Sequence, residues 1–179
     1  MACIVHRLFF AFRVADCARR RVAGHRDDQG CASSIVSDDR LHMTLAITKD
    51  YPQLPLAAVD GMLSIGSSLA ASPVPLRLDQ LSGGRGSVAL RPIRRIKTLT
   101  ELTATLGRRV AAAGLLRSAW RCNPHVTLLY RPGEAFTRAI DPICWTATDI
   151  VLIHSIVGAH QHIELGRWPL VERQGSFDF

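Results

Sequence analysis

The sequence predicts an α+β fold made of two similar lobes, and two observations support this prediction. First, stretches of strand composition and stretches of helical period are interspersed along the chain, and the connections between strands are short enough for mostly antiparallel pairing. Second, a short His-x-Thr-Leu motif occurs twice, and the copies lie 83 residues apart in a chain of 179 residues. A spacing of about half the chain is what an internally duplicated, two-lobed domain would give.

The first part of the chain is expected to form a strand, a helix and a loop. Residues 6–14 are rich in aromatic and aliphatic side chains, which favours a buried strand. Residues 16–24 have the composition of a short helix with a basic face. Residues 25–39 are polar and contain Gly30, so we expect a loop there, with His25 exposed to solvent.

The first motif copy follows this loop. Residues 41–47 read Leu-His-Met-Thr-Leu-Ala-Ile, which is a strand composition. Because successive side chains of a strand point to opposite faces, His42 and Thr44 should share one face. The opposite face should then carry Met43, Leu45 and Ile47.

The middle of the chain is expected to form a helix and a hairpin. Residues 54–71 have a helical period, although Gly61 and Gly66 should weaken this helix because glycine has a low helix propensity. Its buried stripe should consist of Leu56, Val59 and Leu63, with Met62 and Leu69 beside it. Residues 76–81 and 87–90 read as two strands joined by a glycine-rich turn, which lacks the Lys-Ser/Thr pair of a P-loop.

A second helix should begin at a capping box formed by Thr98 and Glu101 and run to about residue 116. Its buried positions should be Leu99, Leu102, Leu106, Val110 and Ala113. Near the end of the chain, residues 145–157 read as one long strand. Gly158 should turn this strand back into residues 163–165.

The second motif copy lies between that helix and the last strand. Residues 124–130 read Pro-His-Val-Thr-Leu-Leu-Tyr, so His125 and Thr127 should share one face. The opposite face should carry Val126, Leu128 and Tyr130. Two chance matches to the motif in a chain of this size should occur on the order of once in several thousand sequences. The repeat therefore indicates a functional pair.

The composition is that of an ordinary globular protein, with 47% apolar and 21% charged residues. We expect residues 1–170 to form a single bilobal domain and residues 171–179 to form a C-terminal tail. No apolar run approaches the length of a membrane span, so we expect no membrane partner, and we expect a monomer.

The charge and the cysteines limit the partners and the compartment. A net charge of +7 and a pI near 9.8 favour an anionic partner, with nucleic acid first among the candidates. The five cysteines are odd in number, and no pair has C-x-x-C spacing. This pattern argues against a disulfide framework and against a zinc site, and it favours a cytoplasmic location.

Two histidines that face one cleft suit paired proton transfer. One neutral imidazole can take a proton while one imidazolium donates a proton, and a nearby hydroxyl can donate a hydrogen bond to the group under attack. This arrangement suits in-line displacement at phosphorus and requires no metal. The rival sites are weaker: His160 and His162 form an H-x-H without accompanying carboxylates, and no G-x-S-x-G is present.

The paired motifs resemble the two signatures of the 2H phosphoesterase superfamily. Within it, the chain is most similar to the bacterial RNA 2′,3′-cyclic phosphodiesterases, also called 2′-5′ RNA ligases. Residues 7–11 are similar to the opening strand of that family, and residues 145–155 and 165–170 are similar to its closing hairpin. The resemblance thus covers about residues 6–170.

This resemblance implies a bilobal α+β fold with two pseudo-symmetric antiparallel sheets, flanked by helices, around a central cleft. It implies a hydrolase that opens 2′,3′-cyclic phosphate ends of RNA to 2′-phosphates without metal, ATP or another cofactor, and that can join RNA ends in reverse. The catalytic residues carried over are His42, Thr44, His125 and Thr127. We assign His42 as the acid and His125 as the base, although the pseudosymmetry leaves the reverse assignment open.

The chain departs from the family at the end of the second motif strand, where many relatives have arginine and this chain has Tyr130. Arg131 or Arg91 is then a candidate for meeting the charge of the phosphate. Tyr130 is a candidate for stacking on a base, with a packed strand-end tyrosine as the alternative. The closing hairpin has His162 where relatives often have tyrosine.

Two further functions stay open at this point. The same chemistry suits a small cyclic nucleotide or a cyclic phosphate of ADP-ribose. A non-catalytic RNA-binding domain would also fit the basic charge, although binding alone needs no pair of acid and base. A third alternative, a metal-dependent hydrolase, would be sensitive to EDTA.

Overall fold

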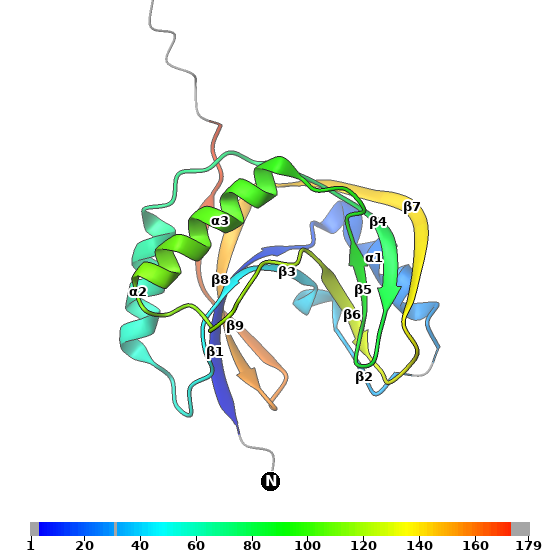
Figure 1. Cartoon of the computed structure of the whole chain (residues 1–179), viewed down its shortest axis with the longest axis horizontal. Coiled ribbons are helices and arrows are strands. Elements are labelled where there is room, and N and C mark those ends of the chain that lie inside the picture. The colour runs from blue at the N-terminus through cyan, green and yellow to red at the C-terminus, as the bar shows by residue number, and fades with distance from the viewer. Residues whose placement is uncertain (1–3, 31, 173–179) are drawn as a thin grey trace, which may run out of the picture.

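A computed structural model describes residues 4–30 and 32–172, and it confirms the α+β class (Figure 1). The elements of the described residues are β1 (Val5–Arg13), α1 (Asp16–Asp27), β2 (Ser34–Ile35), the short 3₁₀ helix η1 (Asp38–Arg40), β3 (His42–Ile47), α2 (Leu56–Ser67), β4 (Val74–Gly83), β5 (Val88–Arg91), α3 (Lys97–Ala112), β6 (Val126–Tyr130), β7 (Phe136–Ala147), β8 (Asp149–Val157) and β9 (Gln161–Pro169). Most of the expected C-terminal tail, residues 173–179, lies outside the described residues.

The strands form one open sheet with two similar halves. The order is β7-β4-β5-β6-β3-β1-β8-β9, and β2 pairs with β6. The motif strands β3 and β6 are neighbours in the middle, and each is the innermost strand of a four-stranded half. The pairing recorded between them is the single antiparallel pair of Met43 with Val126. The two predicted sheets are therefore joined edge to edge through the two motif strands.

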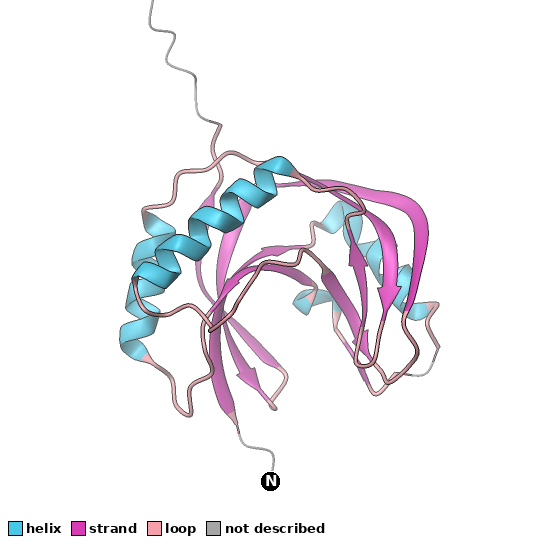
Figure 2. Cartoon of the chain, viewed as in Figure 1, coloured by secondary structure: helices cyan, strands magenta, loops and turns pink. Residues whose placement is uncertain are grey.

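Helix α1 covers one half of the sheet, α2 covers the other, and α3 contacts both halves. Helix α2 packs against β8 and β9, α3 packs against β3 and β4, and α1 packs against β6 and β7. Figure 2 shows α2 and α3 together along one side of the molecule and α1 on the other side. The main core lies between these helices and the sheet, and it includes Phe10 and Phe12 of β1. Phe9 and Ala11, which alternate with them along β1, belong to a smaller cluster on the opposite face.

Each motif strand contains an extra residue directly after its threonine. In the β1–β3 pairing, Phe10 faces Ala46 and Ala11 faces Thr44, which leaves Leu45 without a partner in the ladder. In the β5–β6 pairing, Val88 faces Leu129 and Ala89 faces Thr127, which leaves Leu128 in the same situation. Both irregularities have the form of a β-bulge, which bends the strand and changes the phase of the side chains.

These bulges overturn part of the predicted alternation. Met43 and Leu45 point into the main core, as expected, but Ile47 belongs to the small cluster on the face of His42. Tyr130 likewise leaves the core side and lies on the face of His125, where its side chain is 48% exposed. A strict period of two does not allow for the extra residue, so the prediction for Ile47 and Tyr130 was wrong.

Helix α2 is shorter than predicted, and its contact with the core confirms Met62 and, in part, Val59, Leu63 and Leu69, but not Leu56. Leu56 is 68% exposed, while Val59 and Leu63 are half-buried against the core. The buried residues of α2 are Ala58, Met62 and Gly66. Small side chains lie at this contact because the indole ring of Trp168 from β9 packs directly on Gly66. The predicted stripe assumed that the largest side chains would face the core.

Helix α3 confirms most of its predicted stripe, since Leu99, Leu102, Leu106 and Val110 are buried. The predicted capping box is wrong: the helix begins at Lys97, and Ile96 caps it without a side-chain hydrogen bond. The helix ends at Ala112 because Gly114 has a φ of +70°, which leaves Ala113 exposed beyond the last turn.

Three further boundaries differ from the prediction. Helix α1 continues to Asp27, so His25 lies half-buried in its last turn and not in an exposed loop. The predicted strand at residues 145–157 is two strands, the end of β7 and all of β8. Most of β7 was not predicted from the sequence. It is an edge strand, so one row of its backbone groups faces solvent, and an edge strand tolerates polar side chains and a proline such as Pro142.

Candidate active site

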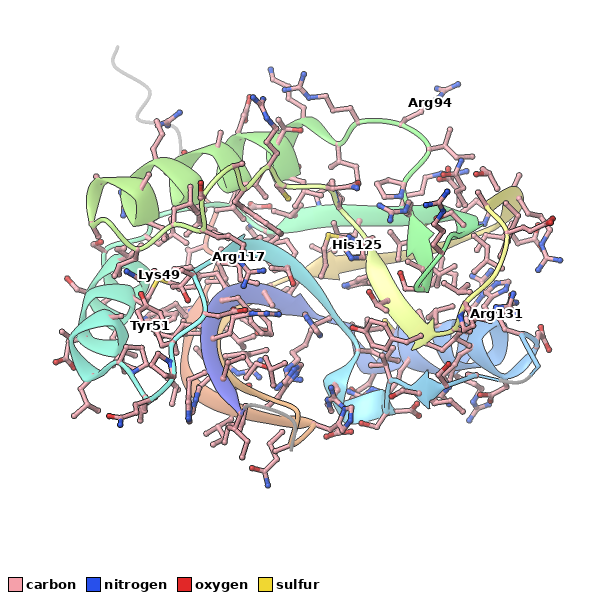
Figure 3. The ribbon with its side chains drawn as sticks, turned by 60° about the horizontal axis from the view of Figure 1, so that its bottom comes forward. Lys49, Tyr51, Arg94, Arg117, His125 and Arg131 are labelled. Carbon is pink, nitrogen blue, oxygen red and sulfur yellow. The ribbon has the colours of Figure 1, made fainter. Side chains whose placement is uncertain are left out.

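A cleft of about 490 Å³ lies over the junction of the two halves. Residues of β1, β3, β6 and β8 line it, together with the turn between β8 and β9. All four motif side chains that the sequence singles out, His42, Thr44, His125 and Thr127, line this cleft. The second histidine lies at the start of β6, near the middle of the molecule (Figure 3).

The strand register explains why these four side chains meet. Met43 and Val126 are directly opposite each other in antiparallel strands. One residue to either side of that pair, the antiparallel register sets His42 against Thr127 and Thr44 against His125. Each imidazole therefore has the hydroxyl of the other motif as its cross-strand neighbour.

Both histidines are held by the same local hydrogen bond. The Nδ1–H of His42 donates to the carbonyl oxygen of Arg40 at 2.6 Å, and that of His125 donates to the carbonyl oxygen of Asn123 at 2.6 Å. A carbonyl only accepts, so the proton of each neutral ring is on Nδ1. The Nε2 atom of each ring is left to accept or donate a proton in the cleft.

Burial makes His42 difficult to protonate. Loss of solvent, with repulsion from Arg13, His125 and Arg40, lowers the pKa of His42 to about 4, although the bond to the Arg40 carbonyl opposes this change. Phe9 stacks on the imidazole, with 4.9 Å between the ring centroids. His42 is therefore a neutral imidazole at pH 7.

The second motif histidine is linked to an arginine. Burial lowers the pKa of His125, and the charge of Arg91 lowers it further. Arg91 donates to Asn123 Oδ1 at 2.8 Å, and the carbonyl of the same asparagine accepts from His125. Arg91 therefore lowers the pKa of His125 from outside the cleft, because it does not line the cleft itself.

The other two candidate substrate-binding residues lie apart from each other. Tyr130 lines the cleft, at the far end of β6 from His125. Arg131 follows it, but its Nη1 donates to the carbonyl of Gln29 at 2.6 Å, away from the residues that line the cleft. Figure 3 shows Arg131 near the edge of the molecule, well away from His125.

The cleft also contains His160 and His162 from the closing hairpin. The ring of His162 meets the ring of His42 edge-on, with 5.2 Å between centroids. Burial and the charges of His42 and Arg40 lower the pKa of His162 to about 3, and its buried Nδ1 has no hydrogen-bond partner among the described residues. The imidazole of His162 is therefore neutral and lines the cleft directly beside the first motif histidine.

Sequence reasoning missed Phe9, Arg7 and Arg40, which also line the cleft. The signal for Phe9 was present, because a strand with Leu8 and Phe10 in the core must point Phe9 to the opposite face. The same alternation puts Arg7, two residues before Phe9, on that face, whereas Arg40 has no such signal because it lies in the short 3₁₀ helix η1.

A larger pocket, of about 720 Å³, lies elsewhere and contains none of the motif residues. Its arginines are each paired with a carboxylate: Arg13 with Glu164, Arg19 with Asp16, and Arg167 with Asp149 and Glu164. The cleft with the two motif histidines is therefore the better candidate for chemistry, although it is smaller.

The structure also bears on metal ligation and on membrane insertion. Within residues 4–30 and 32–172, no three His, Cys, Asp or Glu side chains are arranged to hold a metal ion. Cys17, Cys122 and Cys144 are free, while Cys3 and Cys31 lie outside the described residues. In the part of the chain that the structure describes, no helix is long and apolar enough to span a membrane.

Comparison with known proteins identifies the fold and the family. A solved phosphoesterase is 24% identical, with a TM-score of 0.77 and coverage of 93% of this chain and 99% of that chain. Escherichia coli LigT in its apo form is 24% identical, with a TM-score of 0.76 and coverage of 94% and 99%. A protein from Thermus thermophilus is 18% identical, with a TM-score of 0.74 and coverage of 93% and 100%.

These structures share the fold of the chain, while no curated protein matches its sequence. The profile of the 2′-5′ RNA ligase superfamily matches residues 14–158, a span that includes both motif strands and the sheet junction. Because this match covers most of the sequence, the chain belongs to the 2′-5′ RNA ligase superfamily of 2H phosphoesterases.

Proposed function

We propose that this protein is a metal-independent phosphodiesterase that opens RNA 2′,3′-cyclic phosphate ends to 2′-phosphates, and that the same site can run in reverse as a 2′-5′ RNA ligase. The observation that carries the proposal is the pair of imidazoles in one cleft, each with Nδ1–H bonded to a backbone carbonyl. The solved complex of E. coli LigT with 3′-AMP supports a nucleotide ligand for this fold.

In the proposed reaction, one imidazole takes a proton from water as the water oxygen attacks phosphorus. The bond between phosphorus and the 3′-oxygen breaks, and the second imidazole, protonated beforehand, gives its proton to that oxygen. The product carries a 2′-phosphate and a free 3′-hydroxyl, with one water consumed. Thr44 and Thr127 donate hydrogen bonds to phosphate oxygens as the charge on them grows.

The electrostatics favour His42 as the base, which reverses the assignment made from the sequence. A general base must be neutral before the reaction, and a pKa of about 4 keeps His42 neutral. Two neighbouring cationic groups, Arg13 and Arg40, oppose its protonation. His125 is then the acid, because repulsion at this ring comes from Arg91 alone among the charges that lower its pKa.

The first test is the conversion of an RNA with a 2′,3′-cyclic phosphate end by the purified protein in EDTA. We expect a 2′-phosphate product, and we expect His42→Ala and His125→Ala each to lower kcat/KM by at least about 100-fold, as expected for loss of a general acid or base. Circular dichroism should show that both variants remain folded. Full activity in both variants would contradict the two-histidine mechanism.

A substrate with sulfur in place of the 3′-oxygen tests which histidine is the acid. A thiolate leaves without protonation, so loss of the general acid should matter little for this substrate. We expect His125→Ala to recover most of its activity on the sulfur substrate, while His42→Ala stays inactive. Recovery of His42→Ala alone would show that the two roles are the other way round.

Substrate competition separates the RNA reaction from its closest alternatives. An oligonucleotide, a nucleoside 2′,3′-cyclic phosphate and an ADP-ribose cyclic phosphate should be offered together, and kcat/KM compared for each. We expect the oligonucleotide to be preferred, because the net charge of +7 attracts a polyanion. Salt-sensitive RNA binding without any product would instead favour a non-catalytic binding domain.

A further inference from the structure

A permanent cation in the cleft would favour binding of a phosphodiester there, because charge-assisted hydrogen bonds to phosphate are stronger than neutral ones. The two arginines that the sequence suggests are already engaged elsewhere. Arg131 donates to the Gln29 carbonyl. Arg91 donates to Ser82 Oγ at 2.9 Å and to Asn123 Oδ1 at 2.8 Å. Neither arginine lines the cleft.

Two other arginines do line the cleft, and one of them is already neutralised. Arg7 forms a two-pronged ion pair with Asp50, in which Nε and Nη2 donate at 2.7 and 2.8 Å. Asp50 also accepts from Arg117. A phosphate at Arg7 would have to compete with this carboxylate, so Arg7 is a poor first ligand.

Arg40 is in the opposite situation. Among the described residues, its guanidinium has no ion pair and no hydrogen bond to the protein, and its Nε is fully enclosed without a partner. An enclosed donor without an acceptor is unfavourable, because it has lost its water without replacement. The nearest acidic side chain along the chain, Asp39, accepts a hydrogen bond from Ser37. Arg40 is thus a cation whose hydrogen-bonding capacity is unused.

The position of Arg40 links it directly to the first motif histidine. It is the last residue of η1, two residues before His42, and its carbonyl accepts the Nδ1–H of that ring. Its guanidinium is close enough to lower the pKa of both His42 and His162. The free positive charge is therefore on the β3 side of the cleft, beside the imidazole.

We propose that Arg40 is the phosphate-binding residue of this protein, with its guanidinium donating hydrogen bonds to the non-bridging oxygens of the substrate phosphate. The planar fork of donors on arginine matches two phosphate oxygens at once. This role rests on the proposed function.

Binding of inorganic phosphate tests Arg40 without any need for turnover. Isothermal titration calorimetry would compare the wild type with Arg40→Ala, Arg40→Gln and Arg40→Lys, all of which leave the backbone carbonyl that holds His42 in place. We expect roughly 10- to 100-fold weaker binding in Arg40→Ala and Arg40→Gln, from the loss of hydrogen bonds made by a charged group. Arg40→Lys should be intermediate, because it keeps the charge and loses the fork.

Two matched variants make the result specific. Arg108→Ala removes the same charge from the exposed face of α3 and should bind phosphate as the wild type does. Arg131→Ala tests the arginine suggested by the sequence and should have little effect. Wild-type affinity in both Arg40→Ala and Arg40→Gln would overturn the proposal, and so would an equal loss in Arg108→Ala or a larger loss in Arg131→Ala.

The same variants separate this proposal from the proposed function. If the wild type hydrolyses the cyclic phosphate, Arg40→Ala should lower kcat/KM, and added methylguanidinium should restore part of the loss. If the wild type hydrolyses no cyclic phosphate, the proposed function fails, while phosphate binding still decides the role of Arg40. Titration of the His42 ring by NMR checks the location of the charge, since its pKa should rise in Arg40→Ala; an unchanged pKa would count against the placement.

Discussion

At the scale of single residues, the candidate site contains the same local hydrogen bond twice. Each motif histidine donates its Nδ1–H to the carbonyl two residues before it, which fixes the tautomer and points Nε2 into the cleft. The two rings differ only in what surrounds them. Burial against Phe9, with repulsion from Arg13, His125 and Arg40, lowers the pKa of His42 to about 4, whereas burial and the charge of Arg91 lower the pKa of His125. Symmetric positions thus acquire different acid-base properties.

The pH dependence of kcat/KM should reflect both lowered pKa values. This profile reports the free enzyme, in which the base must be neutral and the acid protonated. Activity should rise as pH increases through about 4, where His42 becomes neutral, and should fall again through the pKa of His125, which lies below 6.5. We therefore expect a maximum below pH 6.5. A maximum well above pH 6.5 in steady-state measurements would contradict the lowered pKa values.

At the scale of elements, a close contact between an aromatic ring and glycine backbone determines how helix α2 packs on strand β9. The indole of Trp168 in β9 packs on Gly66 of α2 and on Gly166 of its own strand, and its Nε1 donates to Ser67 Oγ at 3.2 Å. A Cβ at Gly66 would overlap three atoms of the ring. A glycine that weakens the helix in isolation therefore allows the helix to pack closely on the sheet.

Gly66→Ala should destabilise the protein although it improves helix propensity. Forcing a methyl group against the indole costs about 1–3 kcal/mol, and the gain in helix propensity offsets about 1 kcal/mol of this. We expect a net loss of up to roughly 2 kcal/mol in the free energy of unfolding, measured with urea. Gly107→Ala in α3 is the matched control, because a Cβ there meets no atom within 4 Å, and it should be stabilising. Equal effects in the two variants would contradict the close packing.

At the scale of the whole molecule, two similar halves share one sheet and one active-site cleft. The halves meet at the pair of Met43 and Val126, and each contributes one histidine and one threonine to the cleft. The two motif histidines thus come from different halves. Another histidine of the cleft, His162 of β9, lies beside His42 and is neutral.

Buried neutral histidines should make the fold sensitive to mild acid. The folded-state pKa values of His42 and His162, about 4 and about 3, lie below the ordinary value of 6.5. The unfolded chain therefore binds more protons below pH 6.5, so stability present above that pH is lost as the pH falls toward 4. Between pH 7 and pH 5.5, the free energy of unfolding should fall by roughly 1–3 kcal/mol.

Urea unfolding at the two pH values measures this loss. His162→Phe keeps an aromatic ring beside His42 but removes one titrating group, so the difference between pH 7 and pH 5.5 should shrink. A difference as large as in the wild type would show that His162 is not a source of the acid sensitivity.

Much of the candidate site could be predicted because strand periodicity is a local property. The alternation of side chains put His42 with Thr44 and His125 with Thr127, and the structure has all four in one cleft. The same reasoning identified the buried stripe of α3. It failed at Ile47 and Tyr130, where a bulge after each threonine reverses the phase, because a bulge is set by the pairing with a neighbouring strand.

The sequence by itself determined the fold class, the duplication and the two acid-base motifs, because these depend on residue type and short-range spacing. Only the tertiary structure decided that the motif strands are neighbours in one sheet and that Arg40, among the described residues, is an unpaired cation of the cleft. It also decided that Arg91 and Arg131 are occupied elsewhere. The physical reason is that a side chain's partner, unlike its periodicity, depends on residues far away in the chain, such as Gln29 for Arg131.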